Sequence, residues 1–99
     1  MSRYTVYITP SAIREIKELP GYMRQRVKRA VDDLANNPRP SDSQALNLLG
    51  LSYDVWRYRL EKWRIVYAIT EADKVIDVLA VRKRPPYDYG DLERLLADV

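Results

Sequence analysis

Cysteine and histidine are both absent from the 99 residues of the sequence. Without cysteine the chain has no disulfide, no zinc–cysteine site and no thiol nucleophile. Without histidine it lacks the usual general base near neutral pH, the commonest metal ligand, and the serine–histidine and cysteine–histidine nucleophile pairs. These two absences exclude a large part of enzyme chemistry.

Long apolar runs are absent as well. No segment approaches the roughly 20 residues that a membrane-spanning helix requires, and the first residues lack the apolar stretch of a secretory signal. We therefore expect a cytoplasmic protein with no membrane partner. The chain is 46% hydrophobic and 31% charged, as is typical of one folded domain over residues 1–99. Its net charge of +3 permits an anionic partner without demonstrating one.

The first half of the chain has the pattern of one strand and two helices. Apolar and polar residues alternate over 3–8, which predicts a strand with one buried face. Thr9 and Pro10 form a helix start, and Pro20-Gly21 ends that helix. Apolar residues recur at helical spacing over 22–36, so a second helix follows and the two form a hairpin.

The second half has the pattern of a sheet. Breakers and turn formers gather over 36–43, which predicts the one extended loop of the chain. Three strands are then expected, over residues 53–60, 63–69 and 74–82. Pro85-Pro86 stops the last strand, and Leu92, Leu95 and Leu96 indicate a short C-terminal helix or tail. The expected fold is α+β: an N-terminal strand, a two-helix hairpin and a three-stranded antiparallel meander in one sheet.

The hairpin between the second and third strands predicts a cluster of arginines. A two-residue turn at Glu61-Lys62 places Arg59 directly opposite Arg64 and Arg57 opposite Val66. By alternation, the three arginines share one face while the apolar residues, including Trp56 and Trp63, take the core. Like charges opposed across a ladder destabilise a sheet by up to about 1 kcal/mol, so a bound anion would explain the cluster. Phosphate is the natural ligand for grouped guanidinium groups.

A second basic group ends the last strand at Arg82-Lys83-Arg84, and at least one of its side chains should extend the same patch. Tyr87 and Tyr89 follow it, where an exposed phenol could stack on a base or exchange a proton. Each feature also has a plain structural interpretation. The arginine face can be solvated and balanced by acidic neighbours, the strand-end charges can prevent edge pairing, and a tyrosine is more often core.

The stretches YDVWRYRLEKWRIVYAI and VIDVLAVRKRPPYDY resemble the RelE/ParE superfamily of toxins. The resemblance covers nearly the whole chain and rests on the element order, on Arg64 in its W-R-I-V-Y context, and on the basic strand end followed by tyrosine. It implies a toxin of a type II toxin–antitoxin system. The RelE branch implies a ribosome-dependent endoribonuclease that cleaves mRNA and inhibits translation, and that is inactivated by an antitoxin within a toxin–antitoxin hetero-oligomer.

The resemblance assigns roles to particular residues. Arg64 and Arg84 match the family's catalytic arginines, and Arg57 and Arg59 occupy the places of its phosphate-binding lysines. Tyr89 is the preferred catalytic tyrosine and Tyr87 the alternative, because Pro85-Pro86 alters the spacing. Many relatives carry a histidine where Lys83 stands, so this chain resembles the toxins that work without one. Arg82 and Lys83 are further RNA-contacting candidates.

The implied mechanism is attack of the substrate's own 2′-hydroxyl on the adjacent phosphate, with no metal and no cofactor. An alternative is a ParE-like inhibitor of DNA gyrase, which shares the fold but acts on a protein–DNA complex. A third is an inactive module that binds nucleic acid or antitoxin. The apolar tail from Leu92 to Val99 and the helix hairpin are the expected antitoxin surfaces.

Overall fold

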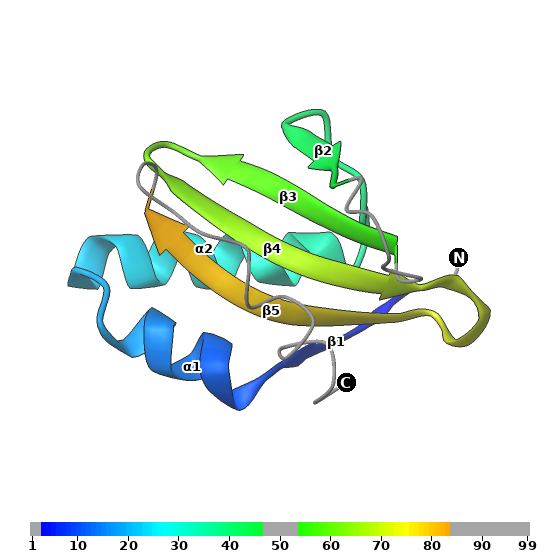
Figure 1. The fold of residues 1–99 in the computed structure, drawn as a ribbon, viewed down its shortest axis with the longest axis horizontal. Helices are drawn as coiled ribbons and strands as arrows, with labels where there is room; N and C mark the ends of the chain where they lie inside the picture. The colour runs from blue at the N-terminus through cyan, green and yellow to red at the C-terminus, as the bar shows by residue number, and fades with distance from the viewer. Residues whose placement is uncertain (1–2, 47–53, 84–99) are drawn as a thin grey trace.

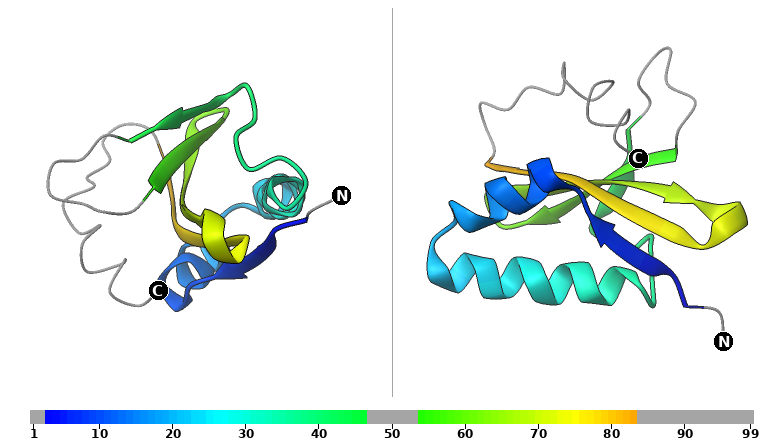
Figure 2. Two further views of the ribbon diagram at one scale, coloured as in Figure 1. Left: turned by 90° about the vertical axis from the view of Figure 1, so that its right-hand side faces the viewer. Right: turned by 90° about the horizontal axis from the view of Figure 1, so that it is seen from below.

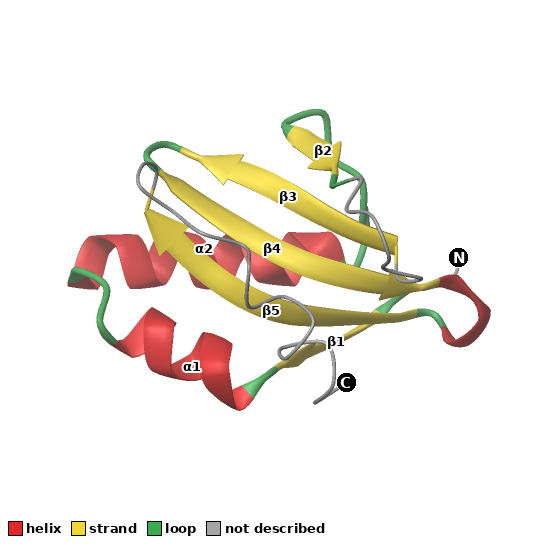
Figure 3. Cartoon of the chain, viewed as in Figure 1, coloured by secondary structure: helices red, strands yellow, loops and turns green. Residues whose placement is uncertain are grey.

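The computed structural model describes residues 3–46 and 54–83. In chain order its elements are β1 (Thr5–Ile8), α1 (Pro10–Lys17), α2 (Gly21–Leu34), β2 (Ser43–Ala45), β3 (Asp54–Leu60), β4 (Trp63–Thr70), the 3-10 turn η1 (Glu71–Asp73) and β5 (Val75–Lys83). Figure 1 shows both helices on one side of a twisted sheet, and Figure 3 marks the same elements by type. The predicted α+β class and the helix hairpin are therefore confirmed.

The sheet is mixed and has five strands in the order β1-β5-β4-β3-β2. β1 pairs with β5 in parallel, whereas β2, β3, β4 and β5 pair antiparallel in that order. The sequence predicted four strands, and that count is wrong by one. The additional strand, β2, pairs Ser43 with Tyr58 and Ala45 with Trp56 at the sheet edge, partly within the segment predicted as loop.

The start of α1 follows the sequence prediction. The Thr9 side chain accepts a hydrogen bond from the Ala12 backbone N–H at 3.3 Å, and Pro10 is the first helical residue. The Thr9 hydroxyl also donates to the Val78 carbonyl of β5 at 3.0 Å. The cap therefore fixes where the helix leaves the sheet. Among the described residues, neither helix is long and apolar enough to cross a bilayer.

The main core lies between the helices and one face of the sheet, as the two-layer arrangement in Figure 2 shows. Buried residues from both layers form it: Ala12, Leu19, Met23, Val27, Val31 and Leu34 from the helical half, and Ile65, Tyr67, Ile69, Ile76, Val78 and Val81 from the sheet. Trp56 and Trp63 are half-buried and pack against this core, as predicted. This packing fixes the β3–β4 hairpin on which the candidate site is built.

The opposite face of the sheet is only partly polar. A second cluster of buried residues lies on it, made of Val55, Val66, Ala68, Leu79 and Ala80. The sequence predicted a cationic outer face, and this expectation holds only near the β3–β4 turn. Val66 and Ala68 alternate with core residues along β4, so that strand is buried on both faces.

Candidate nucleic-acid interface

The β3–β4 hairpin has the register predicted from the sequence. Leu60 pairs with Trp63, Arg59 with Arg64, and Arg57 with Val66 across a two-residue turn. Glu61, the first turn residue, has a φ of 55°, in the left-handed region that tight hairpins often require. Its carboxylate forms an ion pair with Arg26 of α2. The hairpin thus brings the three predicted arginines onto one face.

These arginines line a pocket of about 250 Å³ at the hairpin end of the sheet. The other wall comes from β2 and the residues before it, so the complete lining is Ser41, Asp42, Ser43, Gln44, Arg57, Arg59 and Arg64. A backbone hydrogen bond attaches this wall to β3: the Arg59 N–H donates to the Asp42 carbonyl at 3.1 Å. Ser43 closes a turn by donating from its hydroxyl to the Pro40 carbonyl at 2.6 Å.

Arg57 and Gln44 are cross-strand neighbours on β3 and β2. The Nη2 group of Arg57 donates to the Gln44 Oε1 atom at 2.7 Å. The carboxamide oxygen is neutral, so this bond orients the guanidinium without neutralising it. Arg59, two residues further along β3, is exposed.

Arg64 lies on the predicted face but is far more buried than predicted, with 5% of its surface exposed. Its Nη1 group donates to the Glu61 carbonyl at 2.8 Å and to the Trp63 carbonyl at 2.9 Å. A buried cation is stable only when such bonds compensate its lost hydration. The guanidinium therefore stabilises the hairpin turn and is held rigidly at the edge of the pocket.

Arg82 pairs with Arg64 across the β4–β5 ladder, so it starts on the same face. Its Nε group forms an ion pair with Glu15 of α1 at 3.1 Å. Arg82 is not part of the pocket lining, and Lys83 is exposed at the end of β5. Their RNA-contacting roles remain predictions. Arg84, Tyr87 and Tyr89 lie outside the described residues, as do Pro85-Pro86 and the segment Leu92–Val99.

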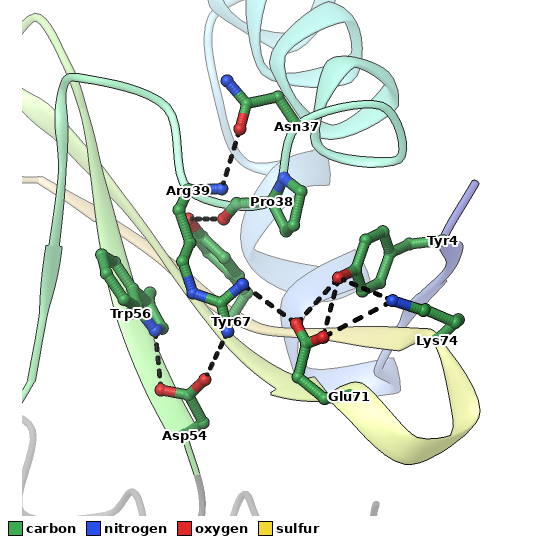
Figure 4. Close-up of polar contacts among 9 residues, drawn as sticks. All are labelled: Tyr4, Asn37, Pro38, Arg39, Asp54, Trp56, Tyr67, Glu71 and Lys74. Atoms are coloured by element: carbon green, nitrogen blue, oxygen red, sulfur yellow. Dashed lines mark hydrogen bonds and ion pairs between the residues drawn. The ribbon is translucent and has the colours of Figure 1, made fainter. Parts of the chain in front are cut away.

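A cluster of polar contacts around one arginine, Arg39, occupies the other end of the β3–β4 ladder (Figure 4). Arg39 forms ion pairs with Asp54 at 2.8 Å and with Glu71 at 2.9 Å, and its guanidinium carbon lies 5.4 Å from the Trp56 ring centroid. Partial burial acts to lower the pKa of Arg39, but the hydrogen bonds to Glu71 and Asp54 outweigh it and the pKa is raised. We call Arg39, Asp54, Glu71 and Trp56 the Arg39 clasp.

Two tyrosines extend the Arg39 clasp. The Tyr4 hydroxyl donates to Glu71 at 2.8 Å, and this bond, followed by the one from Arg39, lowers the pKa of Glu71. The Tyr67 hydroxyl donates to the Pro38 carbonyl at 2.7 Å, and burial raises the pKa of Tyr67 to about 12. The clasp and Tyr67 together fix the chain just before the pocket wall at residues 41–44.

Sequence reasoning missed the pocket wall and the Arg39 clasp. The loop predicted over 36–43 was the sequence feature that could have indicated the pocket wall, since ordered loops on a rigid scaffold often carry binding residues. The partners of Arg39 could not be identified from spacing, because Asp54 and Glu71 are 15 and 32 residues away in the sequence.

A Methanocaldococcus jannaschii protein named RelE1 is 26% identical over 82 residues, which cover 83% of this chain and 91% of the relative. The toxin of the archaeal RelE–RelB complex from Pyrococcus horikoshii superposes with a TM-score of 0.75 at 29% identity, covering 88% of this chain and 100% of that one. The RelBE2 toxin–antitoxin complex of Mycobacterium tuberculosis gives a TM-score of 0.71 at 24% identity, over 83% and 99% of the two chains, and shows a shared fold.

These similarities confirm a toxin of the RelE/ParE superfamily. The profile of one family, described as the ParE toxin of type II toxin–antitoxin system, parDE, matches residues 6–85. The chain belongs to this family of type II toxin–antitoxin toxins. The match runs from the second residue of β1 to the end of β5, and it includes both helices and the arginines of the pocket.

Proposed function

We propose that this toxin is a ribosome-dependent endoribonuclease that cleaves mRNA and thereby inhibits translation. One observation carries the proposal: Arg57, Arg59 and Arg64 line a single pocket on one face of the sheet. Guanidinium groups bind phosphate through several donors at once, and they keep their charge at any physiological pH. A phosphodiester is the substrate class that such a pocket suits.

The proposed reaction needs little proton chemistry from the protein. The substrate's 2′-hydroxyl attacks the adjacent phosphorus, the bond to the 5′ oxygen breaks, and a cyclic phosphate and a 5′-hydroxyl end result. The proton passes overall from the attacking to the departing oxygen. Arg64 and Arg84 stabilise the charge that develops on the phosphate, while Arg57 and Arg59 hold flanking phosphates and Arg82 and Lys83 contact the RNA.

Tyr89, with Tyr87 as the alternative, orients the reacting group or exchanges a proton with it. A phenol of ordinary pKa, near 10, is a weak base at neutral pH, as is an arginine. The site should therefore act slowly on free RNA and depend on the ribosome to position the mRNA.

A cognate antitoxin is the proposed protein partner. The similar toxins of Pyrococcus horikoshii and Mycobacterium tuberculosis were each solved in a complex with an antitoxin. The helix hairpin predicted as an antitoxin surface exposes apolar residues, with Tyr22 67% and Ile13 40% exposed. Burial of these two side chains against an antitoxin would remove apolar surface from water and favour binding.

Inhibition of DNA gyrase is the second candidate, because the matching family is named for ParE. The two functions differ in what they damage. Expression in bacteria without antitoxin, followed by primer extension on mRNA, should reveal new 5′ ends inside translated codons. Intact mRNA together with a DNA-damage response would reject the nuclease and favour gyrase.

The arginine variants make this experiment specific. Arg64→Ala or Arg84→Ala should reduce cleavage by about 100-fold, as expected when one charge-stabilising donor is lost. Arg29→Ala is the matched control, because Arg29 is exposed on α2, away from the pocket. Since Arg64 is buried and bonded to the turn, Arg64→Lys and a thermal unfolding curve separate lost chemistry from lost folding. Cleavage unchanged in both alanine variants would contradict the proposed roles.

A further inference from the structure

Tyr67 links the main core to the loop that leads into the pocket wall. It lies on β4, the central strand of the sheet, and is fully buried. Its hydroxyl donates to the Pro38 carbonyl at 2.7 Å, as Figure 4 shows. Burial raises the pKa of Tyr67 to about 12, and a hydrogen bond with the Ser43 side chain opposes burial only in part. The phenol therefore keeps its proton at physiological pH and remains a donor.

Two prolines limit how this loop can be attached. Pro38 and Pro40 have no N–H, so at these positions the carbonyl is the backbone group that can form a hydrogen bond. The Pro38 carbonyl accepts from Tyr67. The Pro40 carbonyl accepts from Ser43, at 2.6 Å from its hydroxyl and at 2.9 Å from its N–H. Both proline carbonyls therefore help to hold the backbone that leads into β2, a strand of only three residues.

β2 connects the core side of the sheet to the pocket side, because successive side chains of a strand point to opposite faces. Ser43 pairs with Tyr58, which packs against the main core. Gln44, the next residue, pairs with Arg57, which lines the pocket. The Gln44 Oε1 atom accepts from the Arg57 Nη2 group at 2.7 Å. A shift of the loop at Pro38 would therefore move the acceptor that orients the Arg57 guanidinium.

A buried hydroxyl on one face of the sheet is thus connected to a guanidinium on the other face. We propose that Tyr67 is a positioning residue for the pocket: its bond to the loop holds the pocket wall where Gln44 orients Arg57 for RNA. Tyr67 is not part of the pocket lining, so it acts through the wall and does not touch the RNA. The inference rests on the proposed action on RNA, and it names a remote residue on which RNA binding depends.

Tyr67→Phe tests the inference, because it removes the hydroxyl and keeps the ring that fills the core. The probe is a short labelled single-stranded RNA with 2′-O-methyl groups, which lack the attacking hydroxyl and prevent cleavage. Fluorescence anisotropy, measured well below the unfolding midpoint, should show about fivefold weaker binding than wild type, the size expected from one lost hydrogen bond. Amide hydrogen exchange over residues 41–44 should become faster in the same variant.

A double-mutant cycle separates positioning from a general loss of stability. In the Arg57→Ala background the wall no longer has this guanidinium to orient, so Tyr67→Phe should change RNA affinity by less than about twofold. Tyr7→Phe makes the same chemical change at a position of β1 that is 57% exposed, and it should bind RNA like wild type. Val27→Ala removes buried atoms from the core side of α2, which lowers stability, and it should also bind like wild type.

The inference is overturned if Tyr67→Phe leaves RNA affinity or the exchange of the wall unchanged. It is also overturned if Val27→Ala weakens binding equally, or if the loss is undiminished in the Arg57→Ala background. Unfolding curves establish that each variant is folded. Wild type that binds no RNA would overturn the inference and the proposed function together. RNA binding that depends on Tyr67, with mRNA on ribosomes left intact, would remove the nuclease and retain the role of Tyr67.

Discussion

The two ends of the β3–β4 ladder both hold arginine, but in different surroundings. At one end Arg39 contacts two carboxylates and the Trp56 ring, and its charge is matched within the Arg39 clasp. At the other end Arg57 donates to a carboxamide oxygen, and Arg64 donates to two backbone carbonyls. Neutral oxygens orient a guanidinium without cancelling its charge. The comparison shows that Arg39 is tied to carboxylates from two other parts of the chain, whereas Arg57 and Arg64 line a pocket.

The largest effect expected from this difference is loss of RNA binding at the pocket end. Arg59→Gln should weaken RNA binding by about tenfold and reduce the slope of log affinity against log salt by about 0.7, the value for one phosphate contact on a single strand. It should also stabilise the fold by about 0.5 kcal/mol, because Arg59 faces Arg64 across the ladder. Lys62→Gln removes the same charge from the exposed turn and is the control. Equal losses of affinity in both variants would mean that only net charge matters.

The next effect is a loss of stability at the clasp end. Arg39→Ala removes two ion pairs and the contact with Trp56, and leaves Asp54 and Glu71 without their shared cation. The groups are partly exposed, so we expect the free energy of unfolding to fall by about 1–2 kcal/mol. Urea denaturation measures it, with Arg29→Ala as the exposed control. A fall no larger than that of the control would show that the clasp does not stabilise the fold.

The smallest effect is a pH dependence at the clasp. The folded state lowers the pKa of Glu71, so the stabilisation is complete above the unfolded-state pKa, about 4.3, and is lost as the pH falls through the lower folded-state pKa. Thermal unfolding of Glu71→Gln should therefore depend less steeply on pH in this acidic range than wild type. Glu18→Gln, at the exposed end of α1, should retain the wild-type profile. Parallel profiles for wild type and Glu71→Gln would contradict the assignment.

The sequence was sufficient to predict the contacts that depend on local periodicity. The register of Arg59 against Arg64 followed from a two-residue turn and from alternation along the strands, and the helix start at Thr9 followed from capping preferences. β2 was missed because three residues, Ser-Gln-Ala, are too short and too polar to signal a strand. Its formation depends on pairing with β3, which is a tertiary effect.

The exposure of the arginines was harder to predict. Alternation correctly placed Arg64 on the face opposite the main core, but it could not reveal that Val66 and Ala68 on that face are buried as well. Nor could it reveal the partner of Arg82, because Glu15 lies 67 residues away in the sequence. Burial and ion pairing over such separations are decided by the packing of whole elements.

Glu15 also bears on how the sheet avoids self-association. β1 ends at Ile8, opposite Val78, so the last residues of β5 extend beyond the pairing with β1. There the Val81 N–H donates to the Glu15 carboxylate at 3.0 Å. A strand of another molecule would need this N–H as a hydrogen-bond donor in order to pair with the edge of the sheet. The Glu15 carboxylate already accepts from it. A single acidic side chain on α1 thus protects this edge of the sheet from edge-to-edge aggregation.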